Sequence, residues 1–403
     1  MDTRSGFTAP AGARHFQVAV VGAGLVGLAC ALGAAQAGLR VALIGVPGRD
    51  TTKPLDGPWD QRVYAISAAS RRLLRALRVW DRLDPARVAA VRDMHIFARA
   101  DAPRALHFSA YEAAADALAW IIEHRELGRV LETALDYQHG IERFETDASS
   151  VRLDGSQAEV VLGEGLALTA DLIVGADGKH SAVRAAAGLQ ANGRSYGQQG
   201  VVANFACELA HGGSALQWFT DEGIVALLPM PGKDYSLVWS AADALVPELL
   251  ALSPAELAQR VEAIVGSRTG KLVPLGRARA FPLGVMTVPR IIGQRLVLVG
   301  DAAHLVHPLA GQGLNLGFQD VESLLGVLRA REGFRDCGDA VLLRRHERAR
   351  AVPVMAMRTL TDGLQRLFGV QPPLVRRIRD DGMNLLQGLP VLKKALIRQA
   401  MGQ

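Results

Sequence analysis

Three glycines near the N-terminus have the types and spacing that nucleotide chemistry requires. Gly22, Gly24 and Gly27 form the pattern GxGxxG between an apolar run, Gln17–Val21, and a helix-like stretch, Leu25–Gln36. The first glycine permits a tight turn, the second lets the backbone approach a pyrophosphate, and the third lets helix and strand pack closely. N–H groups at the start of the helix would face the phosphates. The context predicts a dinucleotide site rather than a merely structural turn.

One residue expected of such a site is missing. The next strand-like run, Arg40–Ile44, ends at Gly45, where an Asp or Glu normally accepts hydrogen bonds from a ribose. Two interpretations stay open. Either Asp50 or a backbone carbonyl holds the ribose, or the cofactor is bound weakly. A lost charge-assisted hydrogen bond is worth roughly 1.5–3 kcal/mol, which weakens binding about tenfold to a hundredfold.

Two further strings place acids and glycines at strand ends. Residues 171–184 read DxxxGADGxxSxVR, with Asp177 and Gly178 directly after a buried run. Gly300 and Asp301 close the apolar run Arg295–Val299, and the string HPLAGQGLNLG follows from residue 307. A plain strand-end turn with an aspartate cap is the alternative interpretation of the first string. Glycines in the second permit close backbone approach to a ligand.

These strings together resemble the ubiquinone-biosynthesis hydroxylases, which are FAD-dependent aromatic monooxygenases with a para-hydroxybenzoate hydroxylase-like fold. The resemblance runs from about Gln17 to Gly402, and Gly45 is its main departure. It implies an FAD cofactor. The residues that it assigns to FAD binding are Gly22, Gly24, Gly27, Arg62, Arg125, Asp177, Gly178, Gly300, Asp301, Pro308, Gly311, Gln312, Gly313, Leu314 and Asn315.

Two of these assignments rest on short segments. Arg62 lies in DQRVYAIS and Arg125 in IEHREL, both of which are similar to family segments near the flavin. The alternative interpretations are a solvated arginine at 62 and an exposed helix charge at 125. The helix opening at Leu314 is expected to point its N–H groups at the flavin edge where negative charge develops on reduction.

The resemblance also implies the reaction. NAD(P)H reduces FAD, O2 adds at flavin C4a, and the hydroperoxide hydroxylates an electron-rich phenol, which is polyprenylated if the family substrate applies. The cofactor carries this chemistry while the protein positions and desolvates. No catalytic side chain is therefore expected. Pocket candidates, each of which is also an ordinary core residue, are Phe219, Pro229, Trp239, His307 and Pro308.

The motifs imply an α/β architecture. We expect a Rossmann-like FAD-binding domain from residues 1–75, 101–184 and 275–330, an inserted antiparallel β-sheet substrate domain from 76–100 and 185–274, and a helical C-terminal region, 331–403. Ser67–Leu77 is predicted as a serine-capped helix, and Leu118–Leu135 has helical apolar spacing. His304 and His307 lack a third ligand, so no metal site is expected.

Composition bounds the setting of the protein. Three widely separated cysteines and an N-terminus without an apolar signal core indicate a reducing, cytoplasmic location. Between Arg366 and Gln403 seven Lys or Arg side chains face only two Asp, beside regularly spaced leucines. This basic tail predicts peripheral contact with the anionic inner membrane or with a biosynthetic complex, and no nucleic acid. The alternative is a helix packed on the FAD domain with a solvated basic face.

Two rival functions are compatible with the same motifs. One is a different reaction on the same scaffold, a flavin-dependent prenyl reductase. The other is a non-catalytic accessory subunit of the same pathway with weakened FAD binding, for which Gly45 is the feature in favour. Flavin content of the purified protein separates the accessory interpretation from the enzymatic ones.

Overall fold

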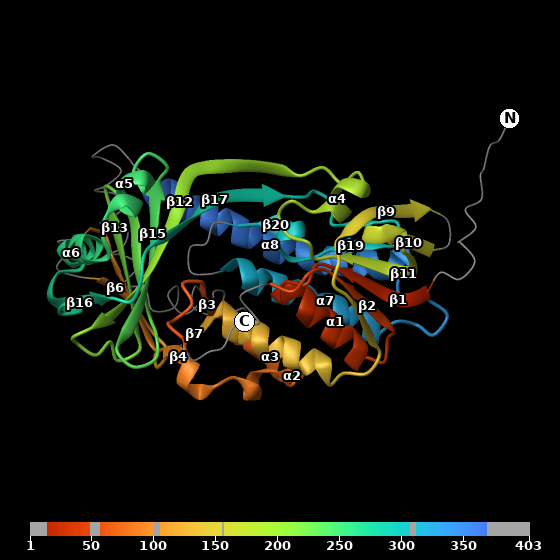
Figure 1. The fold of residues 1–403 in the computed structure, drawn as a ribbon, viewed down its shortest axis with the longest axis horizontal. Helices are drawn as coiled ribbons and strands as arrows, with labels where there is room; N and C mark the ends of the chain where they lie inside the picture. The colour runs from red at the N-terminus through yellow and green to blue at the C-terminus, as the bar shows by residue number, and fades with distance from the viewer. Residues whose placement is uncertain (1–13, 49–56, 100–104, 155–156, 307–311, 369–403) are drawn as a thin grey trace.

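The computed structural model describes residues 14–48, 57–99, 105–154, 157–306 and 312–368. They form two lobes joined by long strands (Figure 1). One lobe is built on a parallel sheet and contains the N-terminal strand. The other is built on an antiparallel sheet. Among the described residues no helix is long and apolar enough to cross a membrane.

The parallel sheet holds the glycine motifs at the carboxyl ends of its strands. Its central strands are uncharged apolar runs, such as VALI in β2, that are buried on both faces, as parallel strands covered on two sides require. Strand order is β18-β19-β11-β1-β2-β8. The strands are β1 (Arg14–Val21), β2 (Val41–Ile44), β8 (Ile141–Phe144), β11 (Ala167–Gly175), β18 (Ile292–Gly293) and β19 (Leu296–Leu298).

Different elements cover the two faces of this sheet. Four helices pack on one face and share its hydrophobic core. They are α1 (Leu25–Gln36), α2 (Ala68–Ala76), α3 (His124–Asp136) and α7 (Gln312–Arg329). The other face is covered by the hairpin β9 (Ala148–Asp154) and β10 (Gln157–Leu162), together with α4 (Ala182–Ala186). The predicted cap is confirmed, because the Ser67 hydroxyl accepts the Ser70 N–H at the start of α2.

The second sheet builds the other lobe. Its order is β20-β17-β12-β15-β14-β13-β5-β6. The strands are β5 (Asp93–Phe97), β6 (Ala105–Ser109), β12 (Asn192–Cys207), β13 (Ser214–Thr220), β14 (Gly223–Pro229), β15 (Asp234–Ala242), β17 (Arg279–Thr287) and β20 (His304–Leu305). β16 (Leu272–Pro274) pairs with β12. β12 and β17 run antiparallel between the lobes (Figure 1).

Two helices cover the outer face of the second sheet. They are α5 (Val246–Ala251) and α6 (Pro254–Val265), and α6 begins with a capping box formed by Ser253 and Glu256. A fully buried apolar cluster fills the space between these helices and the sheet, and it includes Trp218 and Trp239. This core fixes which side chains of the sheet are left to face the other lobe.

A third, small sheet packs against the inner face of the second. It consists of β3 (Val63–Ile66), β7 (Ala119–Glu123) and β4 (Val88–Val91), in the order β3-β7-β4. Its buried apolar side chains share a cluster with Met230 and Leu228 of the antiparallel sheet. The helical prediction for Leu118–Leu135 was therefore wrong over its first six residues, since the segment AWIIE of β7 pairs with strands on both sides and the helix begins only at His124.

The predicted domain division stays a prediction, but the sheets place two segments differently. β6 forms an antiparallel hairpin with β5, so residues 105–109 belong to the antiparallel sheet, whereas the prediction assigned them to the FAD-binding domain. β17 pairs with β12 along most of its length, so residues 279–287 also lie there. The C-terminal region begins with one long helix, α8 (Ala340–Phe368), which contains Pro353. Residues 369–403 lie outside the described residues.

Candidate active site

The turn between β1 and α1 can be built only from glycine at two positions. Gly22 has φ +117°, and a Cβ there would lie 2.3 Å from the backbone oxygen of Ala176, in the turn after β11. A Cβ at Gly27 would lie 1.8 Å from the backbone oxygen of Gly22. Real Cβ atoms do not approach backbone this closely, so both glycines are required by packing. The two strand-end turns are thereby pressed together.

Three other glycines of the predicted motifs have open space instead. Within the part of the chain that the structure describes, no atom lies within 4 Å of a Cβ built at Gly24, Gly178 or Gly313. Helix α1 begins after Gly24 with no side-chain cap and no acid in its first turn. Its first N–H groups are therefore suited to an anionic ligand, which the helix dipole also favours. The cleared backbone and the free helix start fit the pyrophosphate of a dinucleotide.

The second glycine segment meets the first through α7. A Cβ at Gly317 would lie 2.6 Å from Val26 of α1 and 3.2 Å from the Cα of Gly300. Gly300 itself has φ +60° and opens the 3-10 turn η5 (Gly300–Ala302). The two segments, far apart in the sequence, thus converge at one edge of the parallel sheet. Gln312, Gly313 and Leu314, the first residues of α7, are partly exposed there.

The carboxylate of Asp301 stands at this edge. Its side chain is exposed, yet partial desolvation by the surrounding protein raises the pKa of its carboxyl, while nearby His304, Arg62 and Lys179 act in the opposite direction. Arg62 therefore lies near enough to Asp301 to influence it, while its predicted place beside the flavin or its phosphates stays a prediction. Lys179 was not predicted, although it directly follows the DG pair.

Asp177 occupies the turn after β11. One of its oxygens accepts the backbone N–H of Val183, at the start of α4, at 3.1 Å. The other, Oδ1, is buried and has no hydrogen-bond partner among the residues that the structure describes. A buried carboxylate oxygen without a partner is costly, so it is suited to receive a ligand hydroxyl or a water molecule. Gly178 follows with φ +81° and leaves the space beside it open.

Asn315 has a different environment from the one expected of a cofactor ligand. Its side chain is buried inside the protein. The amide oxygen accepts the Ser67 N–H at 2.9 Å and the Ser70 hydroxyl at 2.7 Å, and the amide nitrogen donates to the Ala65 carbonyl at 2.8 Å. Asn315 thus clamps α7 to the segment that joins β3 to α2. Its local role is to hold Arg62, three residues before Ala65, near the glycine loop.

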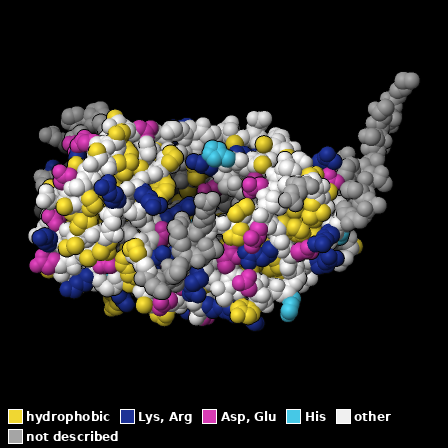
Figure 2. Space-filling model, in the orientation of Figure 1, with side chains coloured by type: hydrophobic (Ala, Val, Ile, Leu, Met, Phe, Trp, Pro, Cys, Tyr) yellow, Lys and Arg dark blue, Asp and Glu magenta, His cyan; other side chains and the backbone are white. Residues whose placement is uncertain are grey.

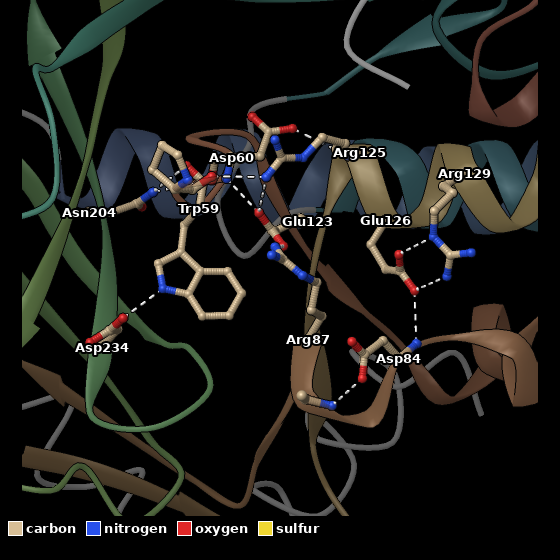
Figure 3. Close-up of polar contacts among 12 residues, drawn as sticks. Trp59, Asp60, Asp84, Arg87, Glu123, Arg125, Glu126, Arg129, Asn204 and Asp234 are labelled. Carbon is tan, nitrogen blue, oxygen red and sulfur yellow. Dashed lines mark hydrogen bonds and ion pairs between the residues drawn. The ribbon is translucent and has the colours of Figure 1, made fainter. Parts of the chain in front are cut away.

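Arg125 also lies in a polar network (Figure 3). It is buried, and its Nη2 donates to the carbonyl of Pro58 at 2.9 Å and lies 3.5 Å from Glu123. Glu123, also buried, pairs with Arg87 at 2.5 Å and accepts the backbone N–H of Asp60. The structure therefore places Arg125 in the wall behind Asp60, and it is not the exposed helix charge of the alternative interpretation.

The same network fastens the loop before β3 to the antiparallel sheet (Figure 3). The indole of Trp59 donates to Asp234 on β15 at 2.6 Å. The amide of Asn204 on β12 donates to the carbonyl of Asp60 at 3.2 Å. Asp60 in turn accepts the backbone N–H of Arg62 at 2.9 Å. The two connections to the antiparallel sheet were not predicted, because their partners lie 175 and 144 residues apart in sequence.

One face of the antiparallel sheet carries Asn204, and this inner face is directed towards the loop that contains Asp60. Alternate residues of β14 and β15 on that face are partly exposed and apolar: Ile224, Ala226, Leu228 and Val238. Figure 2 shows a recess between the lobes in which hydrophobic side chains come into view. An apolar wall opposite a cofactor site is the usual form of a pocket for a small apolar molecule.

The predicted pocket residues divide between the two faces. Phe219 lies on the inner face with Ile224, its cross-strand partner. Trp239 lies on the outer face, fully buried among α5 and α6, and its indole donates to the carbonyl of Glu222. Neighbouring residues of a strand point to opposite faces. Val238 faces the recess, so Trp239, the next residue of β15, cannot line it. Pro229 is buried at the end of β14.

Three predicted site residues fall outside the described residues. They are His307, Pro308 and Gly311. Among the described residues no group of three or more His, Cys, Asp or Glu side chains could hold a metal ion. His304, whose spacing to His307 suggested a ligand pair, lies 2.7 Å from Asp320 instead.

The backbone around Gly45 explains why an acid is absent there. Gly45 has φ +146°, and a Cβ at this position would lie 2.8 Å from the backbone nitrogen of Ala23. Its N–H is held by the Phe144 carbonyl at 3.0 Å. A side chain at residue 45 would therefore strain the turn that carries Gly22 and Gly24. Asp50, the alternative ribose ligand, lies outside the described residues.

Comparisons with known proteins agree with this geometry. The FAD binding domain family matches residues 15–359. The chain is 35% identical to the ubiquinone hydroxylase UbiL of Rhodospirillum rubrum, over 96% of this chain and 89% of that protein. It is 33% identical to the 3-demethoxyubiquinol 3-hydroxylase of Escherichia coli, over 96% and 98%.

A solved structure shows the same fold. It is that of PqsL, a probable FAD-dependent monooxygenase from Pseudomonas aeruginosa, with a TM-score of 0.74 and 22% identity over 92% of this chain and 100% of that one. The α/β fold class and the family resemblance predicted from the sequence are confirmed. The chain belongs to the FAD binding domain family, where it is an FAD-dependent monooxygenase of the ubiquinone-biosynthesis hydroxylase group.

Proposed function

We propose that this enzyme hydroxylates the aromatic ring of a polyprenylated phenol in ubiquinone biosynthesis, using NAD(P)H and O2. Two relatives that align over nearly the whole chain are named for hydroxylation of ubiquinone or its precursors. The partly exposed apolar wall formed by Ile224, Ala226, Leu228 and Val238 suits a substrate with a hydrocarbon chain. The bound flavin supplies oxygen activation, and the protein supplies the site.

The observation that carries this proposal is the convergence of the two glycine segments. Val26, Gly300 and Gly317 come within contact distance, so the β1–α1 turn and the start of α7 can hold one ligand between them. Residues proposed to bind FAD on the described part of the chain are Gly22, Gly24, Gly27, Arg62, Asp177, Gly178, Gly300, Asp301, Gln312, Gly313 and Leu314. Pro308 and Gly311 stay predictions from the sequence. The buried Arg125 and Asn315 support the site from behind.

The chain's own residues perform three tasks in this scheme. The open backbone at Gly24 and the start of α1 bind the pyrophosphate, and Asp301 offers a carboxylate to a ribityl hydroxyl. The apolar inner face of the antiparallel sheet orients the substrate and excludes water from the reacting ring. Exclusion of water matters because water in the site would consume activated oxygen before it reaches the substrate, and no hydroxylated product would form.

Product analysis tests the proposal directly. The purified protein is incubated with NAD(P)H, O2 and a panel of prenylated phenols, and the products are identified by mass spectrometry. We expect a flavin spectrum in the purified protein and one added oxygen atom in one member of the panel. A protein that stays colourless with added FAD contradicts the cofactor assignment. A yellow protein that hydroxylates no member contradicts the substrate assignment alone.

We also propose that the basic tail, residues 366–403, brings the enzyme to an anionic membrane surface. The support is the excess of Lys and Arg beside spaced leucines and isoleucines. Co-sedimentation with vesicles that contain anionic lipid should pellet the wild-type protein more than a variant whose seven tail cations are replaced by Gln. Equal pelleting of the two proteins contradicts this proposal.

A further inference from the structure

A buried group of charges lies directly behind the glycine loop. It joins three elements: His304 on β20, Asp320 on α7 and Arg350 on α8. Their side chains are 3%, 0% and 6% exposed. Buried charges are retained only where they are paired and hydrogen-bonded, so the geometry of this group carries information about its role.

Asp320 is the centre of the group. Its Oδ2 accepts the backbone N–H of Gly300 at 2.9 Å and lies 2.7 Å from Nε2 of His304. Its Oδ1 accepts the Nε–H of Arg350 at 2.6 Å. One carboxylate therefore holds both ends of the turn Gly300–His304, which carries Asp301, and connects it to the C-terminal helix α8. Arg350 also donates to the Leu316 carbonyl at 3.4 Å.

The two basic side chains shift the pKa of Asp320, and Asp320 shifts the pKa of His304. Burial by itself would raise the pKa of Asp320, but His304 and Arg350 outweigh burial and lower that pKa to about 2. Burial would lower the pKa of His304, whereas Asp320 raises it above its ordinary value. A second buried histidine, His346, lies one turn before Arg350 on α8 and contacts Ser323 of α7 at 3.0 Å. It has no direct contact with the Gly300 amide.

We propose that Asp320 is a positioning residue for the cofactor: it fixes the Gly300–His304 turn, and α8 stabilises it there through Arg350. The inference rests on the proposed FAD site. The turn is only five residues long, and Asp320 accepts the N–H of its first residue, Gly300, while lying 2.7 Å from its last, His304. Without Asp320, Asp301 samples directions away from the ribityl chain and FAD binds less tightly.

The alternative is that the group stabilises the fold and leaves the cofactor unaffected. A cavity variant of the same helix separates the two roles. Leu324 is fully buried on α7, one turn after Asp320, and contacts none of the group by hydrogen bonds. Leu324→Ala should lower the melting temperature without moving the Gly300 turn. A second control, Arg345→Gln, breaks an ion pair between α8 and Glu332 that is distant from the turn.

The experiment compares Asp320→Asn, Arg350→Gln and the two controls. FAD dissociation constants are measured by titrating each apoprotein, and the visible spectrum of bound flavin is recorded. We expect Asp320→Asn to weaken FAD binding at least about tenfold and to shift the flavin spectrum, with a smaller change of the same kind in Arg350→Gln. Both controls should keep the wild-type dissociation constant and spectrum.

Hydrogen exchange of the Gly300 amide in the apoproteins gives a readout without cofactor. It should be faster in Asp320→Asn and Arg350→Gln than in the wild type and in both controls. Wild-type affinity, spectrum and exchange in Arg350→Gln overturn the proposal, even where Asp320→Asn does not fold. Failure of the wild-type protein to bind any FAD contradicts the proposed function instead, and the exchange measurement then still decides the role of Asp320 in the turn.

Discussion

At the scale of single residues, the glycines of the site serve two separate purposes. Gly22, Gly27 and Gly317 are required because a Cβ would collide with protein atoms, and they make the close packing of α1, α7 and two strand ends possible. Gly24 and Gly313 leave open space, which is useful only if something else fills it. The distinction gives each glycine a different expected response to substitution.

Gly24→Val should abolish FAD binding without unfolding the protein. Gly24 has φ −80° and ψ 174°, which valine adopts readily, and a Cβ there would meet no atom of the described residues. The added side chain would occupy the space proposed for the pyrophosphate. We expect a loss of affinity of at least about a hundredfold with a nearly unchanged apoprotein melting temperature. Gly326→Ala, at an exposed and equally open position of α7, serves as the control and should bind FAD normally.

His346 should make the stability of the protein depend on pH in mildly acidic solution. Burial lowers its pKa to about 4, with Asp320 opposing this effect and Arg350 and His304 adding to it. Below pH 6.5 the unfolded chain binds a proton at His346 that the folded chain does not, so stability falls as the pH falls towards 4. Between pH 7.5 and 5 this amounts to about 2 kcal/mol.

The comparison with His346→Gln isolates this contribution. Urea unfolding at pH 7.5 and pH 5 should show the drop in the wild type and a smaller one in the variant. His304 does not imitate the effect, because its pKa is raised in the fold, so its contribution is complete below pH 6.5 and is lost only at higher pH. An equal drop in both proteins would show that His346 is accessible to protons in the folded state.

At the scale of elements, the loop that carries Asp60 and Arg62 is held from two sides. Glu123, the last residue of β7, fixes the Asp60 backbone N–H and pairs with Arg87. Asn204 fixes the Asp60 carbonyl from the antiparallel sheet. The loop is thus held by elements of both lobes, and we expect a change at Glu123 to reach Arg62 and the cofactor site.

Glu123→Gln should destabilise the protein and weaken FAD binding together. Removing one partner from a buried ion pair typically costs about 3–5 kcal/mol, although the partial exposure of Arg87 reduces this value. We expect a lower melting temperature and a raised FAD dissociation constant, measured on the same samples. Glu322→Gln, at an exposed position of α7, should change neither. A destabilised variant with unchanged FAD affinity would show that the loop keeps Arg62 in place without Glu123.

Local signals predicted some elements well and failed where distant partners decide. Helix α1 and the capped helix α2 carry their own glycine and serine signals, so their positions followed from the sequence. Strand β7 was predicted as the start of a helix, because its four apolar residues before a helical pattern fit either structure until β3 and β4 supply hydrogen bonds. The partners of Asn315 were equally invisible, since they lie about 250 residues away.

Asp320 could have been singled out from the sequence. It occupies the apolar side of α7, four residues after Leu316 and four before Leu324, where a carboxylate is unusual. That pattern signals a buried acid with a partner, although it cannot name the partner. Arg350 and the Gly300 amide come from segments separated from Asp320 by 30 and 20 residues.

At the scale of the whole molecule, function depends on which face of one sheet meets the other lobe. The sequence indicated an antiparallel sheet with aromatic residues but not its orientation. Trp218 and Trp239 turn out to fill the core beneath α5 and α6, while smaller residues such as Ala226 and Val238 line the inner face. The two tryptophans stabilise the sheet from outside, and the small side chains of Ala226 and Val238 on the inner face leave room for a substrate.

Val238→Trp should therefore separate flavin reduction from hydroxylation. Val238 is partly exposed on the inner face of β15, opposite Val202, and a tryptophan there would fill part of the recess. FAD content should stay at the wild-type level, because none of the glycine segments is touched. NAD(P)H consumption should continue while the oxygen appears as hydrogen peroxide instead of hydroxylated product.

The same substitution at Val273, which is exposed on the edge strand β16, should leave the ratio of product to NAD(P)H unchanged. Full coupling in Val238→Trp would place the substrate elsewhere than against this sheet.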